Sequence, residues 1–149
     1  MVVITFLQFV CAATGIAACV VVFSALRDGT TEKLGNFYNY FVKTHTRLLL
    51  PIAFAVALVL VFQGSPMNWA GKASLVTVQG DSVNVSRGPV AAMVAIKELG
   101  TNGGGFFGVN SAHPLENPTY ISNMVENFAL VLIPMALVFA LGHFLKRRR

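Results

Sequence analysis

The segment Gly100–Gly105, which reads Gly-Thr-Asn-Gly-Gly-Gly, contains the residues of this chain best suited to binding an ion. Glycine permits backbone conformations in which neighbouring peptide groups point to the same side. Such a run could bind a phosphate on its N–H groups, bind a cation on its carbonyls, or let two backbones pack closely. A phosphate loop would be followed by a lysine and a serine or threonine. Here Phe106 and Phe107 follow, which argues against a phosphate site.

The order of helix and loop also separates these three interpretations. Residues 89–99 begin with Pro89, contain mainly helix-forming residues and end before Gly100, so they predict a helix of about 11 residues. The glycines follow this helix and meet its negative, carbonyl-rich end, which favours a cation over an anion. We therefore predict a cation filter made of backbone carbonyls, with a close-packing turn as the alternative. One strand offers only a few oxygens, so a filter needs further strands from other copies or from repeats in a longer chain.

Long apolar segments flank this loop and predict a membrane protein. Hydrophobic residues make up 55% of the 149 residues and charged residues only 11%, whereas about a quarter of the residues in a soluble domain are charged. Residues 1–26, 48–62 and 121–145 are predicted to cross the bilayer as helices, and residues 89–99 are too short to do so. The predicted fold class is an all-α membrane protein, with transmembrane helices, a re-entrant pore helix at residues 89–99 and a selectivity-filter loop at residues 100–105.

A signal peptide is the alternative interpretation of residues 1–26. A signal peptide has a basic start and a shorter apolar core, whereas the basic residue here, Arg27, follows the apolar run. We therefore predict that residues 1–26 are a true membrane span.

The polar segments predict how the chain is oriented. Residues 27–47 form a connector with several basic residues, residues 146–149 form a basic tail, and the long central region is electrically neutral. By the positive-inside rule, the connector and the tail are cytoplasmic and residues 63–88 are extracellular. Within that outer region, residues 74–83 could be a strand pair or an ordered loop. Part of the connector is predicted to be a short amphipathic helix at the membrane interface. Its apolar stripe consists of Leu34, Phe37, Tyr38 and Phe41.

Several longer motifs resemble one protein family. They are Ala95–Phe107, Asn110–Pro114 and Glu116–Thr119 around the glycine loop, Gln8 with Ala12–Gly15 in the first span, and Leu34–Phe37 in the connector. The resemblance covers nearly the whole chain. It is to the potassium-binding, channel-like subunit of the bacterial potassium-transporting ATPase (KdpA).

The resemblance implies a subunit with four pore-loop repeats, of which this chain would hold the end of the first (residues 1–26) and the complete second (residues 48–145). The chain would then be a fragment, a split gene product or a truncated piece, and the other three filter strands would lie elsewhere. In the family, potassium enters from outside, is selected at the filter and passes through an intramembrane tunnel to a P-type ATPase subunit. The implied location is the bacterial plasma membrane, crossed several times, with the C-terminus in the cytoplasm.

The resemblance also implies roles for individual residues and partners. K⁺, the transported ion, would bind to the backbone carbonyls of Thr101, Asn102 and Gly103. The partners would be the ATP-hydrolysing subunit, small accessory subunits of the same complex, the remaining pore-loop repeats and the lipid bilayer, with no nucleic acid. The residues that would shape the filter are Gly100, Gly104, Gly105 and Phe106.

Nothing in the sequence predicts catalysis or an ATP site on this chain, because it has no nucleophile constellation, no acid–base carboxylate pair and no His/Cys cluster. Lys97 and Glu98 precede the glycines and are predicted to form a structural pair. Glu126 lies in the last span, where we expect it to snorkel to the outer interface or pair with a neighbouring helix. Two functions remain open. One is a transport subunit, and the other is a non-conducting membrane interaction module or an inactive truncated fragment.

Overall fold

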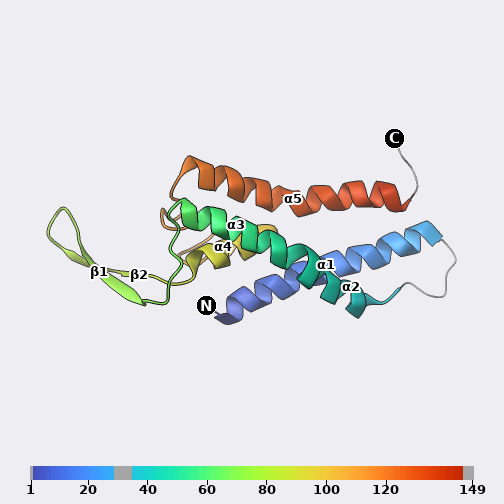
Figure 1. Ribbon diagram of the computed structural model, residues 1–149, viewed down its shortest axis with the longest axis horizontal. Helices are drawn as coiled ribbons and strands as arrows, with labels where there is room; N and C mark the ends of the chain where they lie inside the picture. The colour runs from blue at the N-terminus through green and yellow to red at the C-terminus, as the bar shows by residue number, and fades with distance from the viewer. Residues whose placement is uncertain (1, 29–34, 146–149) are drawn as a thin grey trace.

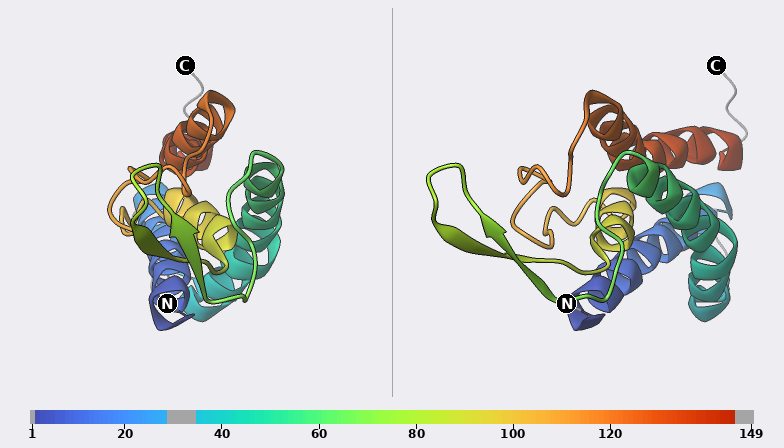
Figure 2. Two further views of the ribbon diagram at one scale, coloured as in Figure 1. Left: turned by 90° about the vertical axis from the view of Figure 1, so that its left-hand side faces the viewer. Right: turned by 60° about the vertical axis from the view of Figure 1, so that its left-hand side comes forward.

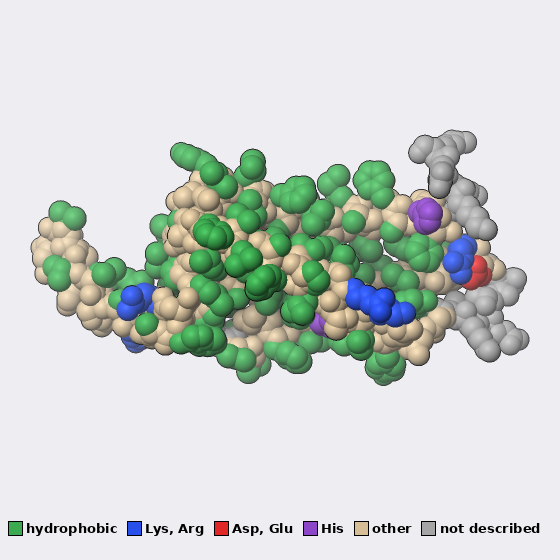
Figure 3. Space-filling view, in the orientation of Figure 1, with side chains coloured by type: hydrophobic (Ala, Val, Ile, Leu, Met, Phe, Trp, Pro, Cys, Tyr) green, Lys and Arg blue, Asp and Glu red, His purple; other side chains and the backbone are tan. Residues whose placement is uncertain are grey.

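The computed structural model describes residues 2–28 and 35–145, and most of them are helical. Three helical stretches are long and apolar enough to cross a membrane: α1 (Val2–Asp28), the stretch Phe37–Phe62, and α5 (Tyr120–Phe144). Apolar side chains cover much of the outer surface of this helical body (Figure 3). The sequence prediction of three apolar membrane helices is therefore confirmed at the level of length and composition. The predicted basic tail and Leu34 lie outside the described residues.

The stretch Phe37–Phe62 is one continuous helix rather than a connector followed by a separate span. It consists of α2 (Phe37–Lys43), the π-helix η1 (Thr44–Leu49) and α3 (Leu50–Phe62). The π-helical turn closes where the Leu50 N–H donates to the His45 carbonyl, directly before Pro51. Proline lacks an N–H, and its ring would clash with a carbonyl one turn earlier in a regular α-helix. The wider π-turn therefore precedes the position where a regular helix would be strained.

Residues 63–88 contain a β-hairpin, which corrects the predicted all-α fold class to a mostly helical one. Strands β1 (Lys72–Val76) and β2 (Ser82–Ser86) pair antiparallel, with Lys72 opposite Ser86. The strand pair was one of two alternatives for this segment, because its alternation of apolar and polar residues is weak. The hairpin projects beyond one end of the helices (Figure 1 and Figure 2).

The short helix α4 (Val90–Leu99) runs from the hairpin end of the bundle into its middle. Near its start, the Ala91 N–H donates to the Pro66 carbonyl (3.1 Å), just beyond the end of α3. Eight of its ten residues are buried, including its last residue, Leu99. Leu99 belongs to a buried cluster drawn from the long helices, whose other members are Ala13, Ile16, Leu49, Ala53, Ala129 and Ile133. The helix therefore ends deep among α1, α3 and α5.

After α4 the chain returns to the end of the bundle from which α4 started. Ser65, just beyond α3, donates from Oγ to the Glu116 carbonyl (3.1 Å). Thr119, the N-cap of α5, donates from Oγ1 to Oε1 of Gln63 (2.8 Å). Helix α4 thus enters the helical body on the side of the hairpin, and the segment between α4 and α5 leaves it on the same side (Figure 2).

The end of α1 and the end of α5 meet at the opposite end of the bundle. The ring centroids of Phe23 and Phe144 are 6.1 Å apart, and the guanidinium carbon of Arg27 lies 5.7 Å from the centroid of the Phe144 ring. The beginning of α2 lies at this end as well (Figure 1). The hairpin and the basic connector are therefore separated by the length of the long helices.

Candidate functional site

The glycine loop begins at a tight helix stop. The Thr101 N–H donates to the Glu98 carbonyl and the Asn102 N–H donates to the Lys97 carbonyl, each at 3.1 Å, which is the hydrogen-bond pattern of a Schellman motif. The left-handed residue of this motif is Thr101, with φ of 54°, and not Gly100, whose φ is −80°. A β-branched residue in the left-handed region is strained by about 1–3 kcal/mol, and such strain clusters at functional sites.

The loop carries backbone carbonyls that accept no hydrogen bond. Within the part of the chain that the structure describes, nothing donates to the carbonyls of Thr101 and Asn102. The Gly103 carbonyl accepts from the Asn110 N–H (2.9 Å). Because a carbonyl oxygen has two lone pairs, Gly103 keeps one acceptor position. The three predicted K⁺ ligands are therefore adjacent, and only Gly103 is already engaged in a turn contact.

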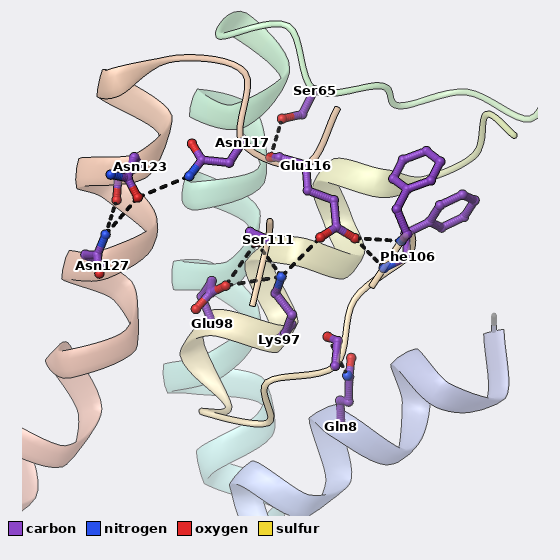
Figure 4. A network of polar contacts seen from close by, with 12 residues as sticks. Gln8, Ser65, Lys97, Glu98, Phe106, Ser111, Glu116, Asn117, Asn123 and Asn127 are labelled. Atoms are coloured by element: carbon purple, nitrogen blue, oxygen red, sulfur yellow. Dashed lines mark hydrogen bonds and ion pairs between the residues drawn. The ribbon is translucent and has the colours of Figure 1, made fainter. Parts of the chain in front are cut away.

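Gln8 of α1 contacts the loop across a separation of 96 residues in the sequence. Its Nε2 donates to the Gly104 carbonyl (3.1 Å), and its side chain lies between α1 and the loop (Figure 4). The residue is buried, and its Oε1 has no hydrogen-bond partner among the described residues. The sequence singled out Gln8 only as part of a family motif, because a contact of this range leaves no local pattern.

Two of the loop glycines occupy positions that a side chain could not take without strain. Gly103 has φ of 77°, a left-handed conformation that favours glycine. A Cβ on Gly105 would lie 2.4 Å from the Gly108 carbonyl oxygen and 2.6 Å from Oε1 of Glu116. The close approach at Gly105 therefore lets a carboxylate reach the backbone of the loop.

The two phenylalanines after the glycines hold the loop against α4 and the returning chain. Phe106 and Phe107 both pack against the buried face of α4. Phe107 also stacks on His113, with ring centroids 4.1 Å apart. His113 itself accepts from the Leu115 N–H through Nδ1 (3.1 Å). The two rings are thus packing residues at the rim of the loop.

A buried carboxylate, Glu116, holds the far side of the loop. Its Oε1 accepts from the backbone N–H groups of Phe106 and Phe107, the latter at 2.9 Å. Its Oε2 lies 3.5 Å from Nζ of Lys97. Figure 4 shows this carboxylate between the loop and α4. Two N–H donors and one ammonium compensate for the cost of burying the charge, and they fix the direction in which the chain leaves the glycines.

Lys97, which is fully buried near the end of α4, is the centre of this network. Its Nζ donates to Oγ of Ser111 and lies 3.3 Å from Oε1 of Glu98. Ser111 in turn donates to the same Glu98 oxygen (3.2 Å). The predicted pairing of Lys97 with Glu98 is confirmed. Sequence reasoning missed Ser111 and Glu116 as its further partners, and the only signal was that both stand in the family motifs.

Glu126 of α5 faces the interior, so snorkelling, the first of its two expected roles, is wrong, and pairing with a neighbouring helix stays a prediction. It is 4% exposed, and its Oε1 has no hydrogen-bond partner among the described residues. The charges of Glu98, Lys97 and Glu116 act on it. Three carboxyl groups and one ammonium therefore share the interior beside the loop.

The fold and the site together define a membrane-protein unit in which long apolar helices enclose a short helix and a carbonyl-bearing glycine loop. The sequence matches the family described as "KdpA: Potassium-transporting ATPase A subunit" over residues 1–149. The chain belongs to this family.

Curated relatives named "Potassium-transporting ATPase potassium-binding subunit" are similar to this chain along nearly all of its length. Identity is 59% over 144 residues with the protein of Flavobacterium psychrophilum, covering 97% of this chain and 25% of the relative. It is 59% over 148 residues with that of Flavobacterium johnsoniae (99% and 26%) and 52% over 146 residues with that of Alicyclobacillus acidocaldarius (98% and 26%). The chain therefore spans about a quarter of the length of the relatives it matches.

Proposed function

We propose that this chain contributes one of four strands of a K⁺ filter in an ATP-driven potassium uptake complex. Residues 1–26 are the end of one pore-loop repeat, and residues 48–145 form the next, with α4 as its re-entrant pore helix and residues 100–105 as its filter strand. The observation that carries this proposal is the pair of adjacent, unengaged carbonyls of Thr101 and Asn102 at the end of an enclosed helix.

Electrostatics at this helix end support a cation. The C-terminus of α4 carries the negative end of the helix dipole, and it points to the segment that bears the free carbonyls. Carbonyl oxygens replace the hydration shell of a potassium ion in backbone filters. Irregular backbone at membrane depth is stable only where it is buried in protein or lines an aqueous path. A loop beside a cation path meets this requirement.

The arrangement of the ends supports an orientation in which potassium enters on the hairpin side. The glycine loop is reached from this end, because the chain enters and leaves the bundle there. Arg27, Lys43 and Arg47 lie toward the other end, where the chain also continues into the basic connector and tail of the sequence, while Lys72 and Arg87 lie on the hairpin side. The positive-inside rule then places the connector and the tail in the cytoplasm and residues 63–88 outside. The location is the bacterial plasma membrane.

The remaining parts of the transporter lie beyond this chain in the proposal. One strand cannot surround an ion, and the relatives are about four times as long, which leaves room for the other pore-loop repeats. ATP hydrolysis belongs to a P-type partner subunit, which works with small accessory subunits in the same complex. This chain contributes selection and passage of K⁺.

A full-length subunit that carries this sequence as its second repeat, assembled in its complex, tests the proposal through Gly103→Asp. The new side chain would be strained at φ of 77°, and its Cβ would lie 3.2 Å from Oδ1 of Asn110. We expect K⁺ to lose its advantage over Na⁺ in protecting the complex against heat, and the KM for K⁺ to rise by about tenfold or more. Gly108→Ala is the matched control, since a Cβ there meets nothing within 4 Å.

A non-conducting interaction module is the second candidate, because the Gly103 and Gly104 carbonyls are both engaged within the chain, as in a packing turn. This second candidate predicts that Gly103→Asp lowers the melting temperature of the complex. It also predicts that the difference between K⁺ and Na⁺ in protecting the complex against heat stays unchanged. That outcome would overturn the transport proposal. Liposomes containing the 149-residue chain alone should show no selective K⁺ flux under either candidate, so the assembled complex is the decisive system.

A further inference from the structure

We infer that Gln8 is a positioning residue of the filter, which fixes the direction of the Gly104 carbonyl from the neighbouring membrane helix. The inference rests on the proposed function of the loop and adds a residue that lies outside it. Gln8 Nε2 donates to the Gly104 carbonyl at 3.1 Å, and Gln8 is 8% exposed. Gln8 is far from the loop in sequence and is contributed by α1, which the proposed organisation assigns to the preceding repeat.

The contact of Gln8 differs from those of the hydroxyl residues on the same helix. Thr14 donates to the Val10 carbonyl (2.8 Å) and Ser24 donates to the Val20 carbonyl (2.9 Å), so each satisfies itself within α1. Gln8 instead donates its side-chain N–H to a carbonyl outside α1, that of Gly104. A primary amide in a buried, apolar environment is costly unless it is hydrogen-bonded, and here the bond is made to the filter strand.

The run of three glycines explains why the Gly104 peptide group needs a partner from another helix. Gly103, Gly104 and Gly105 are consecutive, and glycine backbones have the widest choice of conformations. The Gly103 carbonyl is held by the Asn110 N–H, and the Gly104 carbonyl is held by Gln8. With both held, rotation of these peptide groups is restricted, and the carbonyls of Thr101 and Asn102 keep their direction. Without Gln8, the Gly104 peptide could rotate and carry its neighbours with it.

The rest of the Gln8 carboxamide argues against a purely stabilising role. Its Oε1 is buried and accepts no hydrogen bond among the described residues. An unsatisfied buried acceptor costs at least as much free energy as one hydrogen bond contributes. The donor bond to Gly104 and the orphaned acceptor together therefore add no net stability. What the residue contributes is the direction of a carbonyl next to the ion ligands.

The test uses the full-length subunit in its assembled complex, with Gln8→Met and Gln8→Glu. Methionine keeps the length of the side chain and removes both polar atoms, whereas glutamate keeps the acceptor and removes the N–H₂ donor. Thr14→Val on the same helix is the matched control. The readouts are KM and maximal rate of K⁺ uptake, uptake of Rb⁺ relative to K⁺, and the melting temperature of the complex.

We expect Gln8→Met to raise the KM for K⁺ by about three- to tenfold, the loss that one hydrogen bond would cause, and to leave the maximal rate and the melting temperature close to those of the parent. Gln8→Glu should raise the KM further, because a carboxylate would face the Gly104 carbonyl. Discrimination between K⁺ and Rb⁺ should weaken in both variants and not in Thr14→Val.

Two results would overturn the inference and can be told apart from failure of the proposed function. If KM is unchanged in both Gln8 variants while Gly103→Asp raises it, the filter stands and Gln8 does not position it. If the Gln8 variants lower the melting temperature and maximal rate without changing KM or ion discrimination, Gln8 is only structural. If Gly103→Asp also leaves KM and discrimination unchanged, the loop is not a filter and both proposals fall.

Discussion

Lys97 and Glu116 are 19 residues apart in the sequence, yet Nζ of Lys97 and Oε2 of Glu116 lie 3.5 Å apart with both side chains fully buried. One partner precedes the glycine loop and the other follows it, so the ion pair joins the two ends of the loop. The other carboxylate oxygen of Glu116 binds the N–H groups of Phe106 and Phe107. The position of the loop therefore depends on an ion pair that is fully shielded from solvent.

Replacement of Lys97 by methionine should destabilise the loop strongly. Methionine fills similar space, but it would leave the Glu116 carboxylate buried without its ammonium. Removing one partner of a buried ion pair costs about 3–5 kcal/mol. We expect Lys97→Met to lower the free energy of unfolding of the complex by that amount, measured by thermal or denaturant unfolding, and to reduce K⁺ protection.

The control for this change is Lys72→Met, which removes an exposed lysine from β1. It should change the free energy of unfolding by less than about 0.5 kcal/mol. The double variant Lys97→Met/Glu116→Gln should recover part of the loss, because both members of the pair become neutral together. If the double variant is destabilised by the full sum of the two single variants, the two side chains do not interact as described.

A methyl group at Gly105 should disturb the proposed filter, whereas one at Gly108 should not. At Gly105 the Cβ would lie 2.4 Å from a carbonyl oxygen and 2.6 Å from Oε1 of Glu116, so the backbone or the carboxylate must move. We expect Gly105→Ala to cost about 1–3 kcal/mol and to raise the KM for K⁺. Gly108→Ala meets no atom within 4 Å and should behave as the parent. Equal behaviour of the two variants in melting temperature and uptake would contradict the packing around Gly105.

The apolar helices could be predicted because they need only local information. Length and hydropathy are properties of a contiguous segment, and three such segments became three long apolar helices. The boundary between connector and second span was harder to place. The helix continues through a π-turn before Pro51, and hydropathy does not report on hydrogen-bond register.

The polar contacts of the loop could not be predicted in the same way. Gln8 reaches Gly104 over 96 residues and Lys97 reaches Glu116 over 19, and no periodicity links such positions. The left-handed backbone at Thr101 is also contrary to local preference, which would assign that conformation to a neighbouring glycine. Residue preferences describe which backbone conformations are low in free energy locally. At Thr101 the surrounding structure instead maintains a strained conformation. Within the loop, the residue whose backbone departs from local preference, Thr101, carries one of the free carbonyls.

Glu126 offers a contrast with Glu116, since both carboxyl groups are buried and the charge of Lys97 acts on both. Glu116 accepts two backbone hydrogen bonds and approaches an ammonium, whereas Oε1 of Glu126 accepts nothing from the described residues. Glutamine has the shape of glutamate without its charge. We expect Glu126→Gln to leave the free energy of unfolding unchanged or to raise it by about 1 kcal/mol, and Glu116→Gln to lower it by about 3 kcal/mol.

Unfolding of the two variants of the assembled complex, measured side by side, checks this contrast. Because the substitution is the same at both positions, the difference between them reports the partners of each carboxyl group and not the chemistry of the exchange. A loss of stability at Glu126 as large as that at Glu116 would show that its charge is compensated, by Lys97 or by a group in another part of the transporter. Intact stability together with lost K⁺ uptake in Glu126→Gln would instead place this carboxyl group on the path of the ion, because a charge that the fold does not need would then be needed for transport.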